Sequence, residues 1–208
     1  MQEQELWNEV LGIFNKSDKQ INIYYGTEKN GEKQIETMGI DSNSILGTII
    51  LHTAGICIDN WIRVIGQKSD EHDGICQYNL EKCIITKGML IIAQDIVGGI
   101  FAINISKYSE GSQMIWYFAP DTLEWECLDM NYAEFIEWLA LGNTDQFYHS
   151  MRWASWEKDC MNINFDMVYL IYPFLWSNEC NLDIATKRVV PFIELKEINR
   201  ECAAKIFR

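Results

Sequence analysis

The chain has 208 residues, of which 48% are apolar, and a formal net charge of −13. This length suits one large domain or two small ones, and the apolar content excludes a disordered chain. The 17 Lys and Arg residues are scattered, so no direct binding of nucleic acid is expected. The negative charge favours solubility, or a protein partner with a basic surface.

The seven cysteines are widely spaced and form no Cys-x-x-Cys motif. Some lie in apolar runs, as Cys57 does between Ile56 and Ile58, which predicts buried, reduced thiols and a cytoplasmic protein. The N-terminal residues do not resemble a signal peptide, and no apolar run approaches the roughly 18 residues of a membrane span. Neither a metal site nor a cofactor is predicted.

The N-terminal half predicts one helix followed by strands. Residues 3–14 have the apolar spacing of an amphipathic helix. Residues 15–44 are polar and glycine-containing, which predicts a loop with one short strand at Ile21–Tyr25. Strands are then expected at Leu46–His52, Gly55–Ile58 and Trp61–Ile65, with Asp59-Asn60 as the tight turn between the last two.

The middle of the chain predicts further strands of one sheet. Residues 67–79 are polar and predict a loop. The run Ile84–Asp95, broken at Lys87-Gly88, predicts one buried strand preceded by a shorter element. Further strands are expected at Gly99–Ser106 and Gln113–Ala119, so that the sheet core spans about residues 46–119. Trp125-Glu126 follows the last of these strands and is interpreted as part of an acidic turn.

The C-terminal part, residues 131–206, predicts helices and an aromatic segment. One helix is expected at 131–141 with Gly142 as its end, and a second from Asn143 or Thr144 to about Cys160. Val168–Trp176 predicts an edge strand or a buried loop, and a final helix is expected from Pro191 to about Ile206. The whole pattern predicts a single α+β domain over residues 1–208, with a central, largely antiparallel sheet flanked by helices.

The string Phe118-Ala-Pro-Asp-Thr-Leu-Glu-Trp125, with Tyr172-Pro-Phe-Leu-Trp176 further on, resembles an uncharacterised bacterial family classed as a domain of unknown function. That resemblance covers about residues 46–195. More distantly, residues 85–141 resemble the SUKH superfamily. This second resemblance implies an α+β fold with a central sheet and helices on its sides. It also implies an immunity protein that binds and neutralises a toxin.

Three motifs are interpreted as ordinary structure. Gly98-Gly99 lacks the rest of a phosphate-binding loop, so a turn is expected there. The Asp70–Asp73 segment is expected to be a solvated loop, because consecutive side chains cannot all face one cation. His52 and Cys57 lack a third, orienting group, so no nucleophile–base pair is predicted.

Tryptophan, carboxylate and arginine side chains are the best candidates for a binding site. Core packing of the indoles is one interpretation, and a groove with Asp95, Asp121 and Arg152 at its rim is the other. The predicted binding residues are Asp95, Trp116, Asp121, Trp125, Glu126, Arg152, Trp153, Trp156 and Trp176.

The predicted function is that of a non-enzymatic protein-binding module, of the immunity type, that neutralises a basic toxin or nuclease. An acidic face would attract such a partner, and tryptophan side chains would anchor it. The alternative is a small hydrolase or a carbohydrate-binding or carbohydrate-active protein. It would use Asp121 or Glu126 in an acidic-aromatic groove, with tryptophan stacking on sugars.

Overall fold

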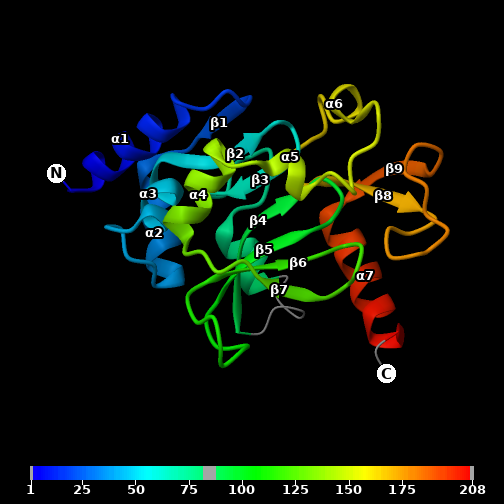
Figure 1. The fold of residues 1–208 in the computed structure, drawn as a ribbon. Coiled ribbons are helices and arrows are strands. Elements are labelled where there is room, and N and C mark those ends of the chain that lie inside the picture. Colours follow the sequence, from blue (N-terminus) through cyan, green and yellow to red (C-terminus); the bar gives the residue numbers. More distant parts are fainter. Residues whose placement is uncertain (1, 82–87, 207–208) are drawn as a thin grey trace.

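Seven antiparallel strands in the described part of the chain form a meander at the centre of the computed structural model. Figure 1 shows their arrangement. The structure describes residues 2–81 and 88–206. Each strand pairs with the strand that follows it in sequence. The strands are β1 (Ile21–Tyr25), β2 (Thr53–Ile58), β3 (Ile62–Ile65), β4 (Met89–Asp95), β5 (Ile100–Asn104), β6 (Ile115–Phe118) and β7 (Trp125–Cys127). The predicted α+β fold with a central antiparallel sheet is confirmed.

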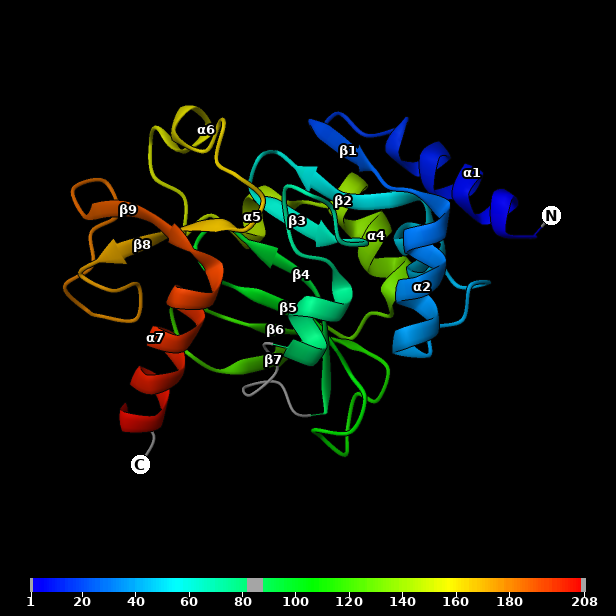
Figure 2. The same cartoon turned by 180° about the vertical axis from the view of Figure 1, so that it is seen from behind.

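Helices flank this sheet, and a second, two-stranded sheet lies beside it. Helices α1, α3 and α4 pack against one another over one face, whereas α7 packs against β8 and β9 at the other end of the molecule (Figures 1 and 2). These elements are α1 (Gln2–Phe14), α2 (Glu28–Met38), α3 (Ile45–His52), the π-helix η1 (Gln77–Glu81), α4 (Tyr132–Leu141), α5 (Thr144–Phe147), α6 (Trp156–Asp159), β8 (Met167–Tyr172), β9 (Thr186–Pro191) and α7 (Phe192–Ile206).

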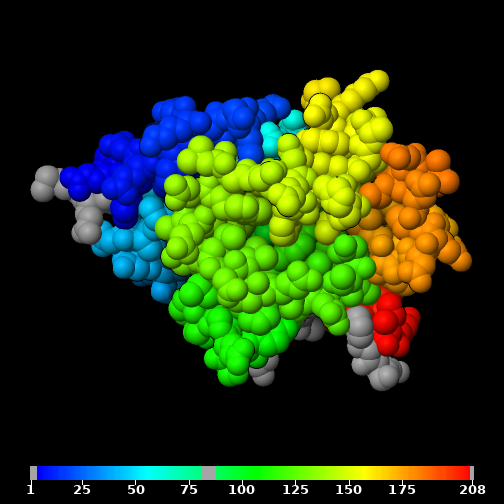
Figure 3. All heavy atoms as spheres, viewed as in Figure 1, coloured from blue at the N-terminus to red at the C-terminus, as the bar shows by residue number. Residues whose placement is uncertain are grey.

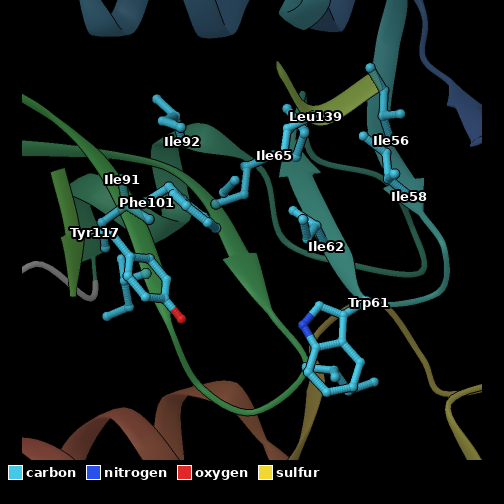
Figure 4. Close-up of a cluster of buried hydrophobic side chains, with 14 of the residues drawn as sticks. Ile56, Ile58, Trp61, Ile62, Ile65, Ile91, Ile92, Phe101, Tyr117 and Leu139 are labelled. Carbon is cyan, nitrogen blue, oxygen red and sulfur yellow. The ribbon is translucent and has the colours of Figure 1, made fainter. Parts of the chain in front are cut away.

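Branched and aromatic side chains fill the core (Figure 4). Every residue of β2, β3 and β5 is buried. Complete burial of one Ile or Phe side chain contributes about 1.5–3 kcal/mol, so these strands supply much of the stability. Trp61, in the turn before β3, is completely buried and lies at one end of the cluster in Figure 4.

The predicted strand at Leu46–His52 is wrong, because these residues form helix α3. Ser44 caps this helix, and its Oγ accepts a hydrogen bond from the backbone N–H of Gly47 (3.0 Å). Residues 46–51 are all buried, so no polar face marks the helical period in the sequence. A short apolar run of this kind fits a buried strand or a buried helix equally well.

Residues 15–44 were expected to be a loop around a short strand, and that expectation is half right. Strand β1 has the predicted bounds. Residues 28–38, however, form α2, which ends at Gly39 in the left-handed conformation (φ 65°). This helix was not predicted because its composition is polar. Only one narrow face is buried, with Gly31, Gln34 and Ile35.

Three corrections concern the C-terminal half. The single helix expected from residue 143 to Cys160 is wrong: it is two short helices, α5 and α6, because the chain between them turns to bury Trp153. Trp125-Glu126 belongs to strand β7, paired with β6, and is not part of a turn. Strand β9 was not predicted, and it contains Pro191, which was expected in the first turn of the final helix. The final helix runs from Phe192 and ends at the predicted Ile206.

The expected loop at residues 67–79 ends in η1, and the strand expected at Ile84–Asp95 begins at Met89 in the described part. Residues 82–87 lie outside the described residues. Six cysteines are described and are free thiols, whereas Cys83 is outside the described ranges. No helix within residues 2–81 and 88–206 is long and apolar enough to span a membrane.

Candidate binding groove

The turn between β2 and β3 organises the residues around the candidate site. Asp59 and Asn60 both adopt positive φ angles, 51° and 53°, as a two-residue hairpin turn of the mirror-image type requires. The next residue, Trp61, is enclosed by segment 143–160. Its ring centroid lies 5.5 Å from that of Tyr148 and 5.3 Å from that of Trp156. Segment 143–160 is therefore folded around one buried indole.

Arg152 lies within this aromatic cluster. Its guanidinium carbon is 4.0 Å from the ring centroid of Trp156 and 5.1 Å from that of Trp61. Its Nη1 donates to the carboxylate of Asp145. The arginine side chain is only 8% exposed, whereas that of Asp145 is 83% exposed. Aromatic faces stabilise a desolvated guanidinium, so the rings hold this ion pair at the surface of the molecule.

Two adjoining hollows, of about 420 and 370 Å³, lie beside Arg152. Both are lined by Asp59, Trp156 and Glu157, so they form one groove. In Figure 3 the yellow segment and the blue N-terminal segment lie on either side of a small cyan patch. We call the groove formed by the two hollows the acidic groove; its charged lining residues are Asp18, Lys19, Asp59, Asp145, Glu157 and Lys158.

The charges of the acidic groove are unbalanced. Burial raises the pKa of Asp59, although its Oδ1 accepts a hydrogen bond from the backbone N–H of Gln20 (3.0 Å). Burial lowers the pKa of Lys19, whose Nζ donates to the carbonyl oxygens of Leu139 (2.7 Å) and Gly142 (2.8 Å). That ammonium group is thus directed at the end of α4. The groove can accept a cationic group, for which it offers carboxylates and an indole.

Asp95 was predicted at the rim of a groove, and this placement is wrong. Its side chain is completely buried. One carboxylate oxygen accepts the backbone N–H groups of Val97 (3.0 Å) and Gly99 (2.8 Å), and the other accepts the hydroxyls of Tyr117 (2.7 Å) and Tyr148 (3.2 Å). Burial raises the pKa of Asp95, although these four hydrogen bonds act to lower it. Asp95 holds the β4–β5 turn together. The local sequence does not distinguish such a buried, turn-stabilising aspartate from an exposed one.

The other predicted residues lie in different parts of the fold. Arg152 and Trp156 belong to the aromatic cluster beside the groove, and so does Trp153, which is buried and donates from Nε1 to Asp159 (2.7 Å). Trp116, Trp125 and Glu126 lie on β6 and β7, at the opposite edge of the sheet from β1.

At that opposite edge, the ring of Trp116 stacks on that of Tyr108, with centroids 4.1 Å apart. The ammonium of Lys107 lies 4.8 Å from the ring centroid of Trp125. Asp121 lies between β6 and β7, and Trp176 follows β8. The Oδ1 of Asp121 and the Nε1 of Trp176 are buried without a hydrogen-bond partner in the described part of the chain.

The carboxylates that line the groove were not among the residues predicted from the sequence: Asp18, Asp59, Asp145 and Glu157. Only Asp59 carried a signal, because Asp59-Asn60 was identified as a tight turn. Turns at strand ends present side chains to neighbouring segments, which is a usual place for binding residues. The other three are separated from it by many residues and come together only through the fold.

The fold and its surface define an α+β protein with an acidic groove lined by a tryptophan. The chain belongs to the family described as "Protein of unknown function DUF2625", whose model matches residues 1–195. It is 31% identical over 170 residues to "Putative uncharacterized protein YbfG" of Escherichia coli, which covers 80% of this chain and 77% of the relative. It is 29% identical over 154 residues to an "Uncharacterized protein" of Haemophilus influenzae, covering 71% and 68%. The uncharacterised bacterial family expected from the sequence is confirmed, and the SUKH resemblance stays a prediction.

Proposed function

We propose that this protein is a non-enzymatic binding module whose acidic groove receives a basic segment of a partner protein. The observation that carries the proposal is the grouping of four carboxylates around Trp156 in one groove. The partner class follows from charge, because the whole chain carries a net charge of −13. An immunity-type role against a basic toxin or nuclease is the biological form that we favour, by resemblance to SUKH domains.

The groove suits a cation for two physical reasons. Asp59 and Asp145 repel each other, and this repulsion contributes to the raised pKa of Asp59. Arg152 already pairs with Asp145, so a further guanidinium or ammonium group would act beside Asp59, where it would relieve the remaining repulsion. Trp156 already stacks with one guanidinium, that of Arg152, so its indole is suited to a cationic neighbour. Rim carboxylates would raise the association rate, and the indole would anchor the complex.

The enzymatic and carbohydrate alternatives receive less support from the geometry. Asp121 and Glu126, the carboxylates that they require, are absent from the lining of the acidic groove. Glu126 is exposed on β7, and its strand partner is the buried Tyr117. One face of the Trp116 indole is covered by Tyr108, which leaves less of it for stacking on a sugar.

The test compares capture by three forms of the protein from a lysate of the organism that encodes it. They are the wild type, the double variant Asp18→Asn/Glu157→Gln, and the control Glu194→Gln/Glu201→Gln. Both variants change the charge equally at exposed positions, but the control positions lie on α7. We expect a basic protein to be captured by the wild type and the control and depleted with the groove variant.

The captured protein is then purified and its affinity for each form is measured at low and high salt. We expect the groove variant to bind roughly tenfold more weakly at low salt, with a smaller difference at high salt because ions screen exposed charges. Equal affinity of the groove variant and the control would refute the acidic groove as the binding site. A substrate turned over by the wild type would refute the non-enzymatic assignment.

A further inference from the structure

Strand β1 leaves one side of its backbone without partners. The backbone N–H of Asp59 donates to the carbonyl of Gln20 (2.8 Å). This bond shows which residue pairs between β1 and β2 are hydrogen-bonded, because Gln20 and Asp59 form one such pair. In that register Ile21 is opposite Ile58, and Ile23 is opposite Ile56. Antiparallel pairs alternate between bonded and non-bonded. The N–H and C=O groups of Ile21 and Ile23 therefore point away from β2, and no hydrogen bond to them occurs among residues 2–81 and 88–206.

This edge lacks the features that usually protect an exposed strand. Natural edges carry a charged residue or a proline, or are covered by another element. The strand Ile21-Asn-Ile-Tyr-Tyr25 has neither a charge nor a proline. Tyr24 is 40% exposed and Tyr25 is 70% exposed. In Figures 1 and 2, β1 lies at the border of the sheet.

A row of hollows follows the same stretch of chain. The acidic groove is lined by Asp18, Lys19 and Gln20, directly before β1. A hollow of about 550 Å³ is lined by Tyr24, and another of about 420 Å³ is lined by Tyr25 and the residues after it. Residues before, within and after β1 thus line successive hollows. Such an arrangement offers room for side chains of a segment that runs alongside the strand.

Carboxylates dominate the lining of these hollows. Asp18, Asp59, Asp145 and Glu157 line the acidic groove, and Glu71 and Asp70 line the two hollows beside Tyr24 and Tyr25. Their basic lining residues are Lys19, Lys158 and Lys68, of which Lys19 is hydrogen-bonded to the end of α4. A segment placed along β1 would therefore meet a surplus of negative charge.

We propose that the partner binds as an extended, basic strand that pairs with β1 and becomes an eighth strand of the sheet. This inference rests on the proposed function and specifies the conformation of the partner segment. Backbone hydrogen bonds to Ile21 and Ile23 fix the register, as in other complexes formed by strand addition. Lysine or arginine side chains of the segment lie in the hollows that border β1.

The test is amide hydrogen exchange by NMR with a defined probe. The probe is a capped ten-residue peptide in which Lys or Arg alternates with Val. In the free protein, the amides of Ile21 and Ile23 should exchange fast, whereas those of Asn22 and Tyr24 should already be protected. Saturation with the peptide should slow exchange at Ile21 and Ile23 by about tenfold or more, because exchange then requires release of the added strand.

Two controls separate this inference from the proposed function. A peptide with the same charge but with Pro in place of Val cannot pair as a strand. The variant Ile23→Pro removes an N–H that has no partner within the sheet, so it should fold with Asn22 still protected. If the proline peptide binds the acidic groove as well as the valine peptide, or if Ile21 and Ile23 stay unprotected, the strand inference is wrong while the basic-segment proposal stands.

Concentration-dependent protection of Ile21 and Ile23 in the free protein would also overturn the inference, because a second copy of the chain would then occupy the edge. If the peptide binds with no difference between the wild type and Asp18→Asn/Glu157→Gln, the proposed function itself fails. Protection of Ile21 and Ile23 by the valine peptide in the wild type, with protection of Ile21 lost in Ile23→Pro, supports strand addition.

Discussion

Single buried polar residues hold the turns on which the candidate site depends. Asp95 accepts four hydrogen bonds in the turn between β4 and β5, and one of the donors, Tyr148, also packs against Trp61. Gly99 follows this turn, where a Cβ atom would lie 2.1 Å from the Asp95 carboxylate. The same side chain thus links the central sheet to the segment that carries Arg152.

The variants Asp95→Asn and Asp95→Ala should therefore differ strongly in stability. Asn keeps an oxygen for the N–H groups of Val97 and Gly99, and its amide can donate to the two tyrosine hydroxyls. Ala removes the carboxylate acceptor of all four groups and leaves the Tyr117 hydroxyl only the weak Met151 sulfur acceptor at 3.8 Å. This loss should cost about 3–5 kcal/mol of unfolding free energy. Urea denaturation of both variants measures the difference. Equal destabilisation by Asn and Ala would show that the hydrogen bonds are not responsible.

The raised pKa of Asp95 also predicts a pH effect. Its folded pKa lies above the unfolded value of 3.8, so the folded protein holds this proton more tightly. Ionisation of Asp95 therefore lowers the free energy of unfolding. This loss is absent below pH 3.8 and grows as the pH rises through the folded pKa. The stability of Asp95→Asn relative to wild type should therefore increase with pH in that window. Denaturation curves of both proteins at several pH values test this, and a constant difference would contradict it.

At the level of elements, α4 is fixed at both ends by side chains. Asn131 and Glu134 form a capping box at its start, where the Asn131 side chain accepts from the N–H of Ala133 (2.9 Å) and of Glu134 (3.1 Å). Lys19 donates to the carbonyls of Leu139 and Gly142 at its end. Asp145, in the acidic groove, follows closely after that end, so Lys19 fixes the position of the groove wall.

Replacing Lys19 by Met should lower the unfolding free energy by about 1–2 kcal/mol, because two hydrogen bonds from a charged group are lost. The exposed Lys16 provides the matched control, since Lys16→Met removes the same charge without these bonds. Thermal or urea denaturation of both variants gives the comparison. An equal effect of the two substitutions would assign the loss to net charge alone.

Asn131→Ala should cost about 1 kcal/mol, as is typical for the loss of a helix N-cap. Glu134→Gln is the companion variant, because its amide oxygen can still accept from the Asn131 backbone N–H. We expect it to retain most of the stability in the same urea titration. A neutral Asn131→Ala would mean that tertiary packing alone positions α4.

Elements with a clear period or cap were predictable from sequence, and the site was not. The helices ending at Phe14 and Leu141 have an apolar stripe or a glycine end signal, and β1 has the expected bounds. Helix α3 lacks a polar face, and β7 has only three residues, so local pattern could not identify them. The groove joins Asp18, Asp59 and Asp145, whose proximity is a property of packing and not of spacing.

At the scale of the whole molecule, salt should change the stability and the proposed binding in opposite directions, because the chain has a net charge of −13. Like charges repel within the folded protein, and screening by salt weakens this repulsion. Attraction to a basic partner is weakened by the same screening.

Raising the NaCl concentration from about 10 mM to about 100 mM shortens the Debye length from roughly 30 Å to roughly 10 Å. The melting temperature should rise over this range while the affinity for a basic peptide falls. Differential scanning fluorimetry and titration calorimetry in the same buffers measure the two quantities. A fall of both together would indicate that specific surface ion pairs, and not the net charge, dominate the electrostatics.

The sequential order of the seven strands has a consequence for biosynthesis. A ribosome releases β1 first, and each later strand finds the preceding one as its only neighbour in the growing sheet. The sheet can grow in one direction, because no later strand has to insert between two strands that are already paired. Once β2 has paired with β1, the other side of β1 stays unpaired while the later strands are synthesised. A partner encountered early could therefore bind before the rest of the chain is complete.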